Sequence, residues 1–130
     1  MTPRLRTIAA LVFVHALWGS AWGQDSNDWV DVRGPSELRT LMSNKSFKDG
    51  WGTIRAFRSD GKGLFVMSSG ERIPNTWSIH GTKEICATPQ KGDAECWSVR
   101  RHRRDTTMVR FTFDNGVIVS YQINDGVPDF

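Results

Sequence analysis

The chain has 130 residues, of which 24% are charged and 38% are hydrophobic, and its formal net charge is +3. This length suits one domain built around a single core. Two basic residues, Arg4 and Arg6, lie in a segment that we expect to be removed. The remaining chain then carries about +1, which is too balanced for a general nucleic-acid binder.

The first 23 residues have the three parts of a secretory signal peptide. The two arginines give a positive start, residues 8–18 form an apolar run interrupted only by His15, and small side chains follow. The run is shorter than the roughly 20 residues that span a bilayer, although an uncleaved N-terminal anchor is an alternative. No cysteine stands at the cleavage site, which excludes a bacterial lipid anchor, and no later segment is apolar enough to cross a membrane. We therefore expect a periplasmic or secreted protein. The predicted cleavage site is defined by Ala21, Gly23 and Gln24.

A short helix is expected over residues 35–42. Leu38, Leu41 and Met42 recur with helical spacing, and Pro35 suits a first helical position. The domain organisation that we expect is a signal peptide over residues 1–23, a polar segment over residues 24–34 and one β-barrel domain over residues 35–130.

Short strands and turns follow the helix. The expected strands include residues 52–58, 63–67, 77–79 and 84–87, and the expected turns or breaks are residues 59–62, Gly70, Pro74–Asn75 and 80–83. Turn signals at such close spacing indicate an antiparallel sandwich or a small barrel. We favour a meander that closes into a barrel, because closure removes exposed sheet edges.

The two cysteines, Cys86 and Cys96, predict a hairpin. In an oxidising compartment they most simply form a disulfide. If they face each other across antiparallel strands, Ile85 opposes Trp97.

The clearest hairpin is near the C-terminus. A two-residue Asn-Gly turn would mix apolar and polar side chains on each face. A three-residue loop over residues 114–116 instead pairs Phe113 with Val117 and Phe111 with Val119, so that the apolar side chains share one face. We therefore predict the second register, with the glycine of the loop in the left-handed conformation.

Two histidines and two cysteines are spaced symmetrically, as in some zinc sites: His80, Cys86, Cys96 and His102. Six residues separate each histidine from its cysteine, which is roughly 20 Å in an extended chain and too far for one coordination sphere. We therefore predict a disulfide, no metal and no cofactor.

One run of basic residues has two interpretations. It could bind an anionic partner such as lipid head groups, a polysaccharide or nucleic acid. It could instead be a solvated strand end, with Asp105 beginning the charge compensation, and we favour this because blocks of like charge are usually solvated. The run is Arg100, Arg101, His102, Arg103 and Arg104.

Several motifs within residues 41–99 resemble a family of small exported proteobacterial proteins of unknown function. The motifs are Gly50-Trp51-Gly52, Ser59-Asp60-Gly61, Trp77-Ser78, Ile85-Cys86 and Glu95-Cys96-Trp97. The resemblance implies a lipocalin-like barrel and an extracytoplasmic location, and it implies no active-site residue. This chain departs from the pattern at Ser59, where the family pattern has proline. Small exported bacterial protease inhibitors are similar in size, in their single disulfide and in their barrel-like fold, a likeness of form alone.

No catalytic constellation stands out, because neither of the two later histidines lies near a nucleophile motif such as G-x-S-x-G, and no two carboxylates are marked as a pair. Our first hypothesis is an exported, non-catalytic barrel that binds a macromolecular partner, a protein or another component, in or beyond the cell envelope, with an inhibitor as one form of such a binder. The alternatives are a carrier of a small hydrophobic ligand and an enzyme of unknown class. The aromatic residues are expected to fill the barrel, which leaves at most a shallow pocket at its mouth.

Overall fold

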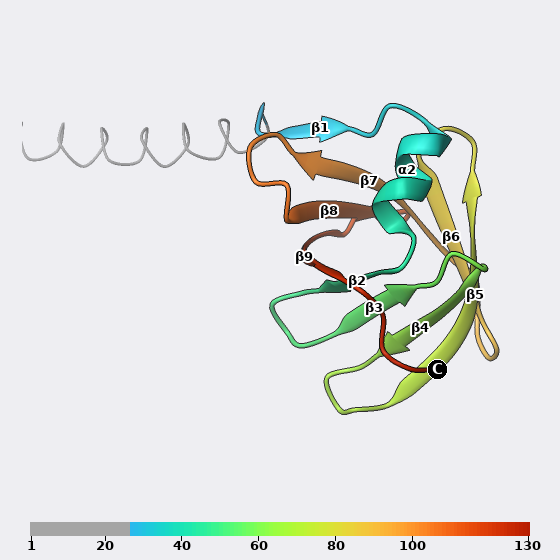
Figure 1. The fold of residues 1–130 in the computed structure, drawn as a ribbon. Helices are drawn as coiled ribbons and strands as arrows, with labels where there is room; N and C mark the ends of the chain where they lie inside the picture. Colours follow the sequence, from blue (N-terminus) through green and yellow to red (C-terminus); the bar gives the residue numbers. More distant parts are fainter. Residues whose placement is uncertain (1–26) are drawn as a thin grey trace, which may run out of the picture.

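The computed structural model describes residues 27–130. The predicted signal peptide and its cleavage residues, Ala21, Gly23 and Gln24, lie outside this range. Within it the chain forms one short helix and nine strands (Figure 1). These elements are β1 (Trp29–Asp31), α2 (Pro35–Met42), β2 (Lys45–Lys48), β3 (Ile54–Phe57), β4 (Lys62–Val66), β5 (Arg72–His80), β6 (Glu84–Pro89), β7 (Glu95–His102), β8 (Met108–Phe113) and β9 (Ile118–Asp125).

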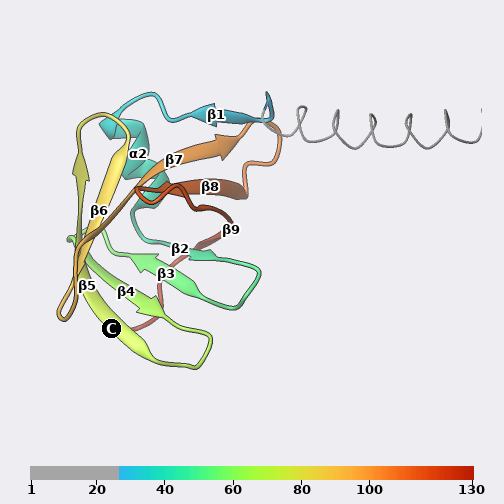
Figure 2. The ribbon, with the colours of Figure 1, turned by 180° about the vertical axis from the view of Figure 1, so that it is seen from behind.

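Strands β2 to β9 form a closed antiparallel barrel. Each strand pairs with the next along the chain, and β9 pairs with β2 to complete the circle. Strand β1 pairs antiparallel with the part of β7 that extends beyond β6, and β1 and β7 lie side by side in both views (Figures 1 and 2). The predicted mainly β meander barrel with one short helix is therefore confirmed.

Aromatic side chains fill the barrel interior. Inward and outward residues alternate along the strands, and the rings of Phe47, Phe57, Trp97 and Phe111 are fully buried. The Trp97 and Phe111 rings stack with centroids 5.3 Å apart, and Phe47 lies 5.5 Å from Phe111. The centre of the barrel is thus a packed core, as the aromatic content predicted.

Helix α2 covers one end of this core. Leu38 and Met42 are fully buried and belong to the same apolar cluster as the barrel interior. Pro35 occupies the first turn, where its missing N–H costs no hydrogen bond. The predicted helix over residues 35–42 is confirmed.

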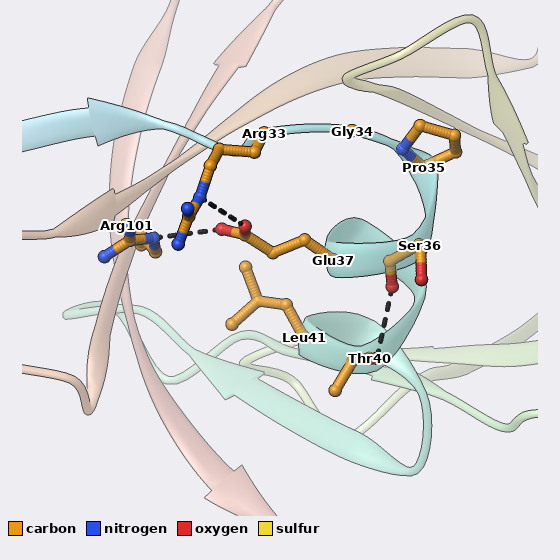
Figure 3. Close-up of a pocket in the computed structure, with 8 residues that line it drawn as sticks. All are labelled: Arg33, Gly34, Pro35, Ser36, Glu37, Thr40, Leu41 and Arg101. Carbon is orange, nitrogen blue, oxygen red and sulfur yellow. Dashed lines mark hydrogen bonds and ion pairs between the residues drawn. The ribbon is translucent and has the colours of Figure 1, made fainter.

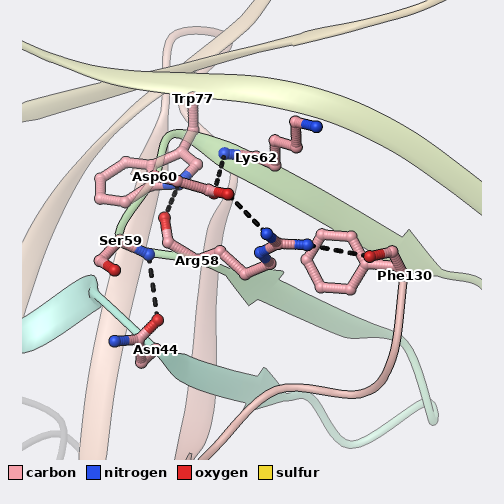
Figure 4. Close-up of polar contacts among 7 residues, drawn as sticks. All are labelled: Asn44, Arg58, Ser59, Asp60, Lys62, Trp77 and Phe130. Atoms are coloured by element: carbon pink, nitrogen blue, oxygen red, sulfur yellow. Dashed lines mark hydrogen bonds and ion pairs between the residues drawn. The ribbon is translucent and has the colours of Figure 1, made fainter.

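A polar junction follows the helix and joins three parts of the chain (Figure 4). Asn44 has a left-handed backbone (φ 59°), and its Oδ1 accepts the N–H of Ser59 at 3.0 Å. Arg58, in the same turn, donates to the carbonyl of Phe130 and pairs with Asp60 at 2.6 Å. The C-terminal residues are thereby held against the turn between β3 and β4.

Both predicted hairpin registers are confirmed. Cys86 pairs with Cys96 and forms a disulfide with it, and the neighbouring Ile85 pairs with Trp97. In the last hairpin Phe111 pairs with Val119, and the loop glycine has a φ of 87°.

The predicted break at Pro74–Asn75 is wrong, because both residues lie inside β5. The last residue pair between β5 and β6 is Asn75 with Pro89. Just beyond it, the carbonyl of Pro74 accepts the N–H of Gln90, so the backbone groups of Pro74 point toward the β6 side. The missing N–H of Pro74 therefore breaks no strand pairing.

Strand β1 lies within residues 24–34, the segment that the sequence analysis described only as polar.

No helix among residues 27–130 is long and apolar enough to span a membrane.

Candidate functional site

Four hairpin loops meet at the end of the barrel opposite α2. In an up-and-down barrel the loops after β2, β4, β6 and β8 all lie at one end. They comprise residues 49–53, 67–71, 90–94 and 114–117. We call this end the mouth.

Large apolar side chains are exposed at the mouth. Trp51 is 74% exposed at the tip of the β2–β3 loop, and Met67, Val117 and Ile118 are 38%, 50% and 57% exposed in or beside two other loops. Only one other large hydrophobic residue of the described chain, Phe130, is comparably exposed. Grouped exposed apolar residues mark interaction sites in soluble proteins, whereas scattered ones carry no such meaning.

A pocket of about 460 Å³ opens between the same loops. All four loops or the strand ends beside them contribute to it. It is lined by Asp49, Thr53, Arg55, Met67, Ala94, Glu95, Cys96, Phe113, Asp114, Asn115, Val117, Val119 and Tyr121.

The side chain of Arg55 projects into the barrel beneath the mouth and is only 13% exposed. Its Nη1 lies 2.6 Å from Oε1 of Glu95, and its Nε donates to the hydroxyl of Tyr121 at 3.2 Å. The guanidinium also lies over the ring of Phe65 at 4.5 Å and over that of Trp97 at 5.2 Å. The carboxylate and the aromatic faces each attract the guanidinium. Arg55 therefore lies between the pocket that it lines and the core ring of Trp97.

The charges around the pocket affect the pKa of the Tyr121 phenol. Burial raises the pKa of its phenol above the ordinary value of 10.0, and the nearby carboxylates of Asp49 and Glu95 raise this pKa further. The charge of Arg55 and its hydrogen bond act in the opposite direction. Tyr121 is the single tyrosine of the whole sequence, so its signals report on this pocket alone.

Side-chain hydrogen bonds shape two of the mouth loops. Oδ1 of Asp49 accepts the N–H groups of Trp51 at 2.8 Å and Thr53 at 3.0 Å. In the loop after β8, Oδ1 of Asn115 accepts the N–H of Val117 at 3.0 Å. Such bonds stabilise tight turns, and here they fix the backbone that carries the exposed Trp51 and Val117.

A second cavity, of about 620 Å³, lies beside the start of α2 (Figure 3). Glu37 reaches into it and contacts Arg33 at 3.3 Å and Arg101 at 3.0 Å. The charged side chains of this cavity thus form ion pairs with one another. Because Leu41 is the only large aliphatic residue in its lining, we consider the mouth the better candidate despite the smaller volume.

The predicted basic run lies at the end of β7 and in the turn after it. Acidic residues in β1, in α2 and just before β1 compensate three of its arginines. The ion pairs are Arg100 with Asp31 at 3.0 Å, Arg101 with Glu37 at 3.0 Å and Arg104 with Asp28 at 2.7 Å. Asp105, which the sequence suggested as the first compensating charge, instead accepts hydrogen bonds from Thr107. The run thus holds the N-terminal strand and the helix to the barrel.

The other two members of the run contact the chain through the Arg103 backbone and the His102 ring. The backbone N–H of Arg103 donates to the carbonyl of Asp28 at 2.6 Å. The ring of His102 lies edge-on to Trp29 at 4.9 Å, and its Nδ1 accepts the backbone N–H of Asp105 at 2.9 Å.

The four residues with zinc-like spacing make separate contacts. The sulfurs of Cys86 and Cys96 are bonded to each other, so neither is available as a thiolate. His80 lies within hydrogen-bond distance of the Ser78 hydroxyl, and His102 contacts Trp29.

The sequence left room for at most a shallow pocket at the mouth and did not identify its residues. One signal was present, since Arg55 stands two positions before the buried Phe57 and so shares its inward face. A charged residue at an inward position indicates a buried pair or a site. Its partner Glu95 lies on a strand that is not adjacent in the sheet, so no local pattern links the two.

Comparisons with models of protein families, with curated proteins and with solved structures found no match for this chain.

Proposed function

We propose that this protein binds a partner protein at the mouth of its barrel, outside the cytoplasm. The observation that carries this proposal is the group of exposed apolar residues, led by Trp51, around an open pocket. Tryptophan is enriched among the residues that dominate binding energy in protein interfaces. A rim of this kind is costly to keep in water unless it is covered part of the time.

A partner protein is favoured over a small-molecule carrier by the filled interior. Trp97, Phe47, Phe57 and Phe111 leave a pocket only at the mouth, whereas a carrier buries most of its ligand. The proposed activity has no catalytic step and needs no cofactor. The Cys86–Cys96 disulfide supports export, because disulfides persist mainly in oxidising compartments.

Site-specific photocrosslinking in the cells that make the protein would test this function. A benzoylphenylalanine at Ser69, an exposed residue of the β4–β5 loop, should give a discrete adduct with one protein. The same residue at Thr106, which is exposed in the turn between β7 and β8 far from the mouth, is the matched control. Equal or absent labelling at the two positions would contradict binding at the mouth.

The contribution of Trp51 can be tested in the same format. Adding Trp51→Ala to the Ser69 crosslinker should weaken the complex by about 2 kcal/mol, or roughly 30-fold, if Trp51 is a central contact. Since Trp51 is 74% exposed, its removal should leave the free energy of unfolding nearly unchanged. An adduct of unchanged yield would remove Trp51 from the interface.

A further inference from the structure

The charges that line the mouth pocket are unequal. Arg55 shares the pocket lining with three carboxylates, those of Asp49, Glu95 and Asp114. Glu95 neutralises Arg55 across 2.6 Å. The carboxylates of Asp49 and Asp114 therefore remain without a counter-ion among the pocket residues.

The apolar walls of the pocket suit the methylene stem of a long basic side chain. Met67, Phe113, Val117 and Val119 line the space beside the carboxylates. Lysine and arginine bury their methylene stems along apolar surfaces while their charged heads reach polar groups. Trp51, at the tip of the adjoining loop, adds an aromatic ring of the kind that attracts cations.

Building on the proposed function, we propose that the mouth pocket receives an arginine or lysine side chain of the partner protein. The charge complementarity favours this occupant, because an anionic group would meet two uncompensated carboxylates and would have to displace Glu95 from Arg55. The stem of the basic side chain lies along Phe113 and Val117, and its head pairs with Asp49 and Asp114.

The direct test uses small probes with the intact protein, labelled with ¹³C in its single tyrosine. N-acetylarginine methylamide should shift the ring signals of Tyr121 in a saturable way. The matched neutral probe, N-acetylcitrulline methylamide, has nearly the same shape and should bind at least about fivefold more weakly, and N-acetylglutamate methylamide should not bind. Equal binding of the arginine and citrulline probes, or stronger binding of glutamate, would overturn the inference.

Variants locate the charge dependence. Asp114→Asn keeps the size of an exposed side chain and should weaken the arginine probe about two- to fivefold, the range expected for an exposed ion pair. Asp93→Asn, in the loop after β6 and outside the pocket lining, is the control and should leave the affinity unchanged. Unchanged affinity in Asp114→Asn would contradict the assignment.

The two proposals can fail separately. If the arginine probe does not bind but the Ser69 crosslink forms, the mouth binds a partner by another chemistry and only the basic anchor is wrong. If the probe binds and no crosslink forms, the pocket is selective for cations but the protein-binding function is wrong.

Discussion

At the scale of single residues, Arg55 links several groups beneath the mouth. It connects Glu95, Tyr121 and the rings of Phe65 and Trp97 in one buried contact set. Removing one partner of a buried ion pair leaves an unpaired charge, which costs more than the pair contributes. The Glu95 carboxyl is 44% exposed, so water reduces this penalty on its side.

The phenol of Tyr121 gives a pH prediction. Its pKa is raised above 10.0 in the folded state, chiefly by burial. A raised pKa means that its contribution to the free energy of unfolding is complete below pH 10 and is lost as the pH rises through the folded-state value. The near-ultraviolet absorbance of the single tyrosine should therefore titrate above pH 10 in native protein.

Substitution of Arg55 should move that titration in a defined direction. Arg55→Gln removes a positive charge that lowers the pKa of Tyr121, so the midpoint should rise further. Arg72→Gln is the control and should leave the midpoint where it is, because the exposed Arg72 side chain donates to the carbonyl of Asp129 and is not among the groups that shift the Tyr121 pKa. A midpoint that falls in Arg55→Gln would show that another group controls this phenol.

At the scale of elements, β1 depends on a few contacts. It pairs with only three residues of β7. Trp29 is 8% exposed and lies beneath the guanidinium of Arg110, 4.3 Å from the ring centre. The ion pairs of Arg100 and Arg104 add exposed contacts, which are individually weak.

Truncation of Trp29 should release β1 from the barrel. We expect Trp29→Ala to cost about 2–4 kcal/mol, because it removes a large buried side chain, and Arg100→Ala to cost less than about 1 kcal/mol. Hydrogen exchange should show faster exchange at β1 in Trp29→Ala, with β8 still protected. Comparable exchange in the two variants would mean that the ion pairs hold β1 as strongly as the tryptophan does.

The elements themselves were largely predictable from local pattern. The register of the last hairpin was predicted correctly because Phe111 and Val119 must share a face. The helix was predicted correctly because Leu38 and Met42 recur with helical spacing. Strand β1 was missed, since three residues in a polar segment show no alternation. The contact between Arg55 and Glu95 could not be read from the sequence either, because it crosses the barrel interior and depends on the diameter at which the sheet closes.

At the scale of the whole molecule, the disulfide joins strands β6 and β7 at the base of one mouth loop. Cys86 and Cys96 are ten residues apart and flank the loop between β6 and β7. Cross-linking a loop of this length stabilises the folded state by about 3 kcal/mol in the chain-entropy description. For a domain of this size that is a large share of the net stability.

Loss of the disulfide should therefore be measurable by urea unfolding. Cys86→Ser combined with Cys96→Ser should lower the free energy of unfolding by about 3 kcal/mol. A reducing agent should lower the stability of the original protein to the same level and leave the double variant unaffected. If the original protein keeps its stability under full reduction, confirmed by mass after alkylation, the bridge contributes nothing.

The separation of the two barrel ends has a practical consequence for engineering. The largest fully buried side chains all lie on the strands and on α2, whereas the four mouth loops carry none of them. Gly52, Gly70 and Gly92 have positive φ angles and should be kept. Randomisation of the other residues of these loops, Trp51, Ser68, Ser69, Gln90, Lys91 and Asp93, should leave the barrel able to fold. The protein offers a small, disulfide-bridged scaffold for display libraries, in which new recognition surfaces can be selected on adjustable loops above a constant frame.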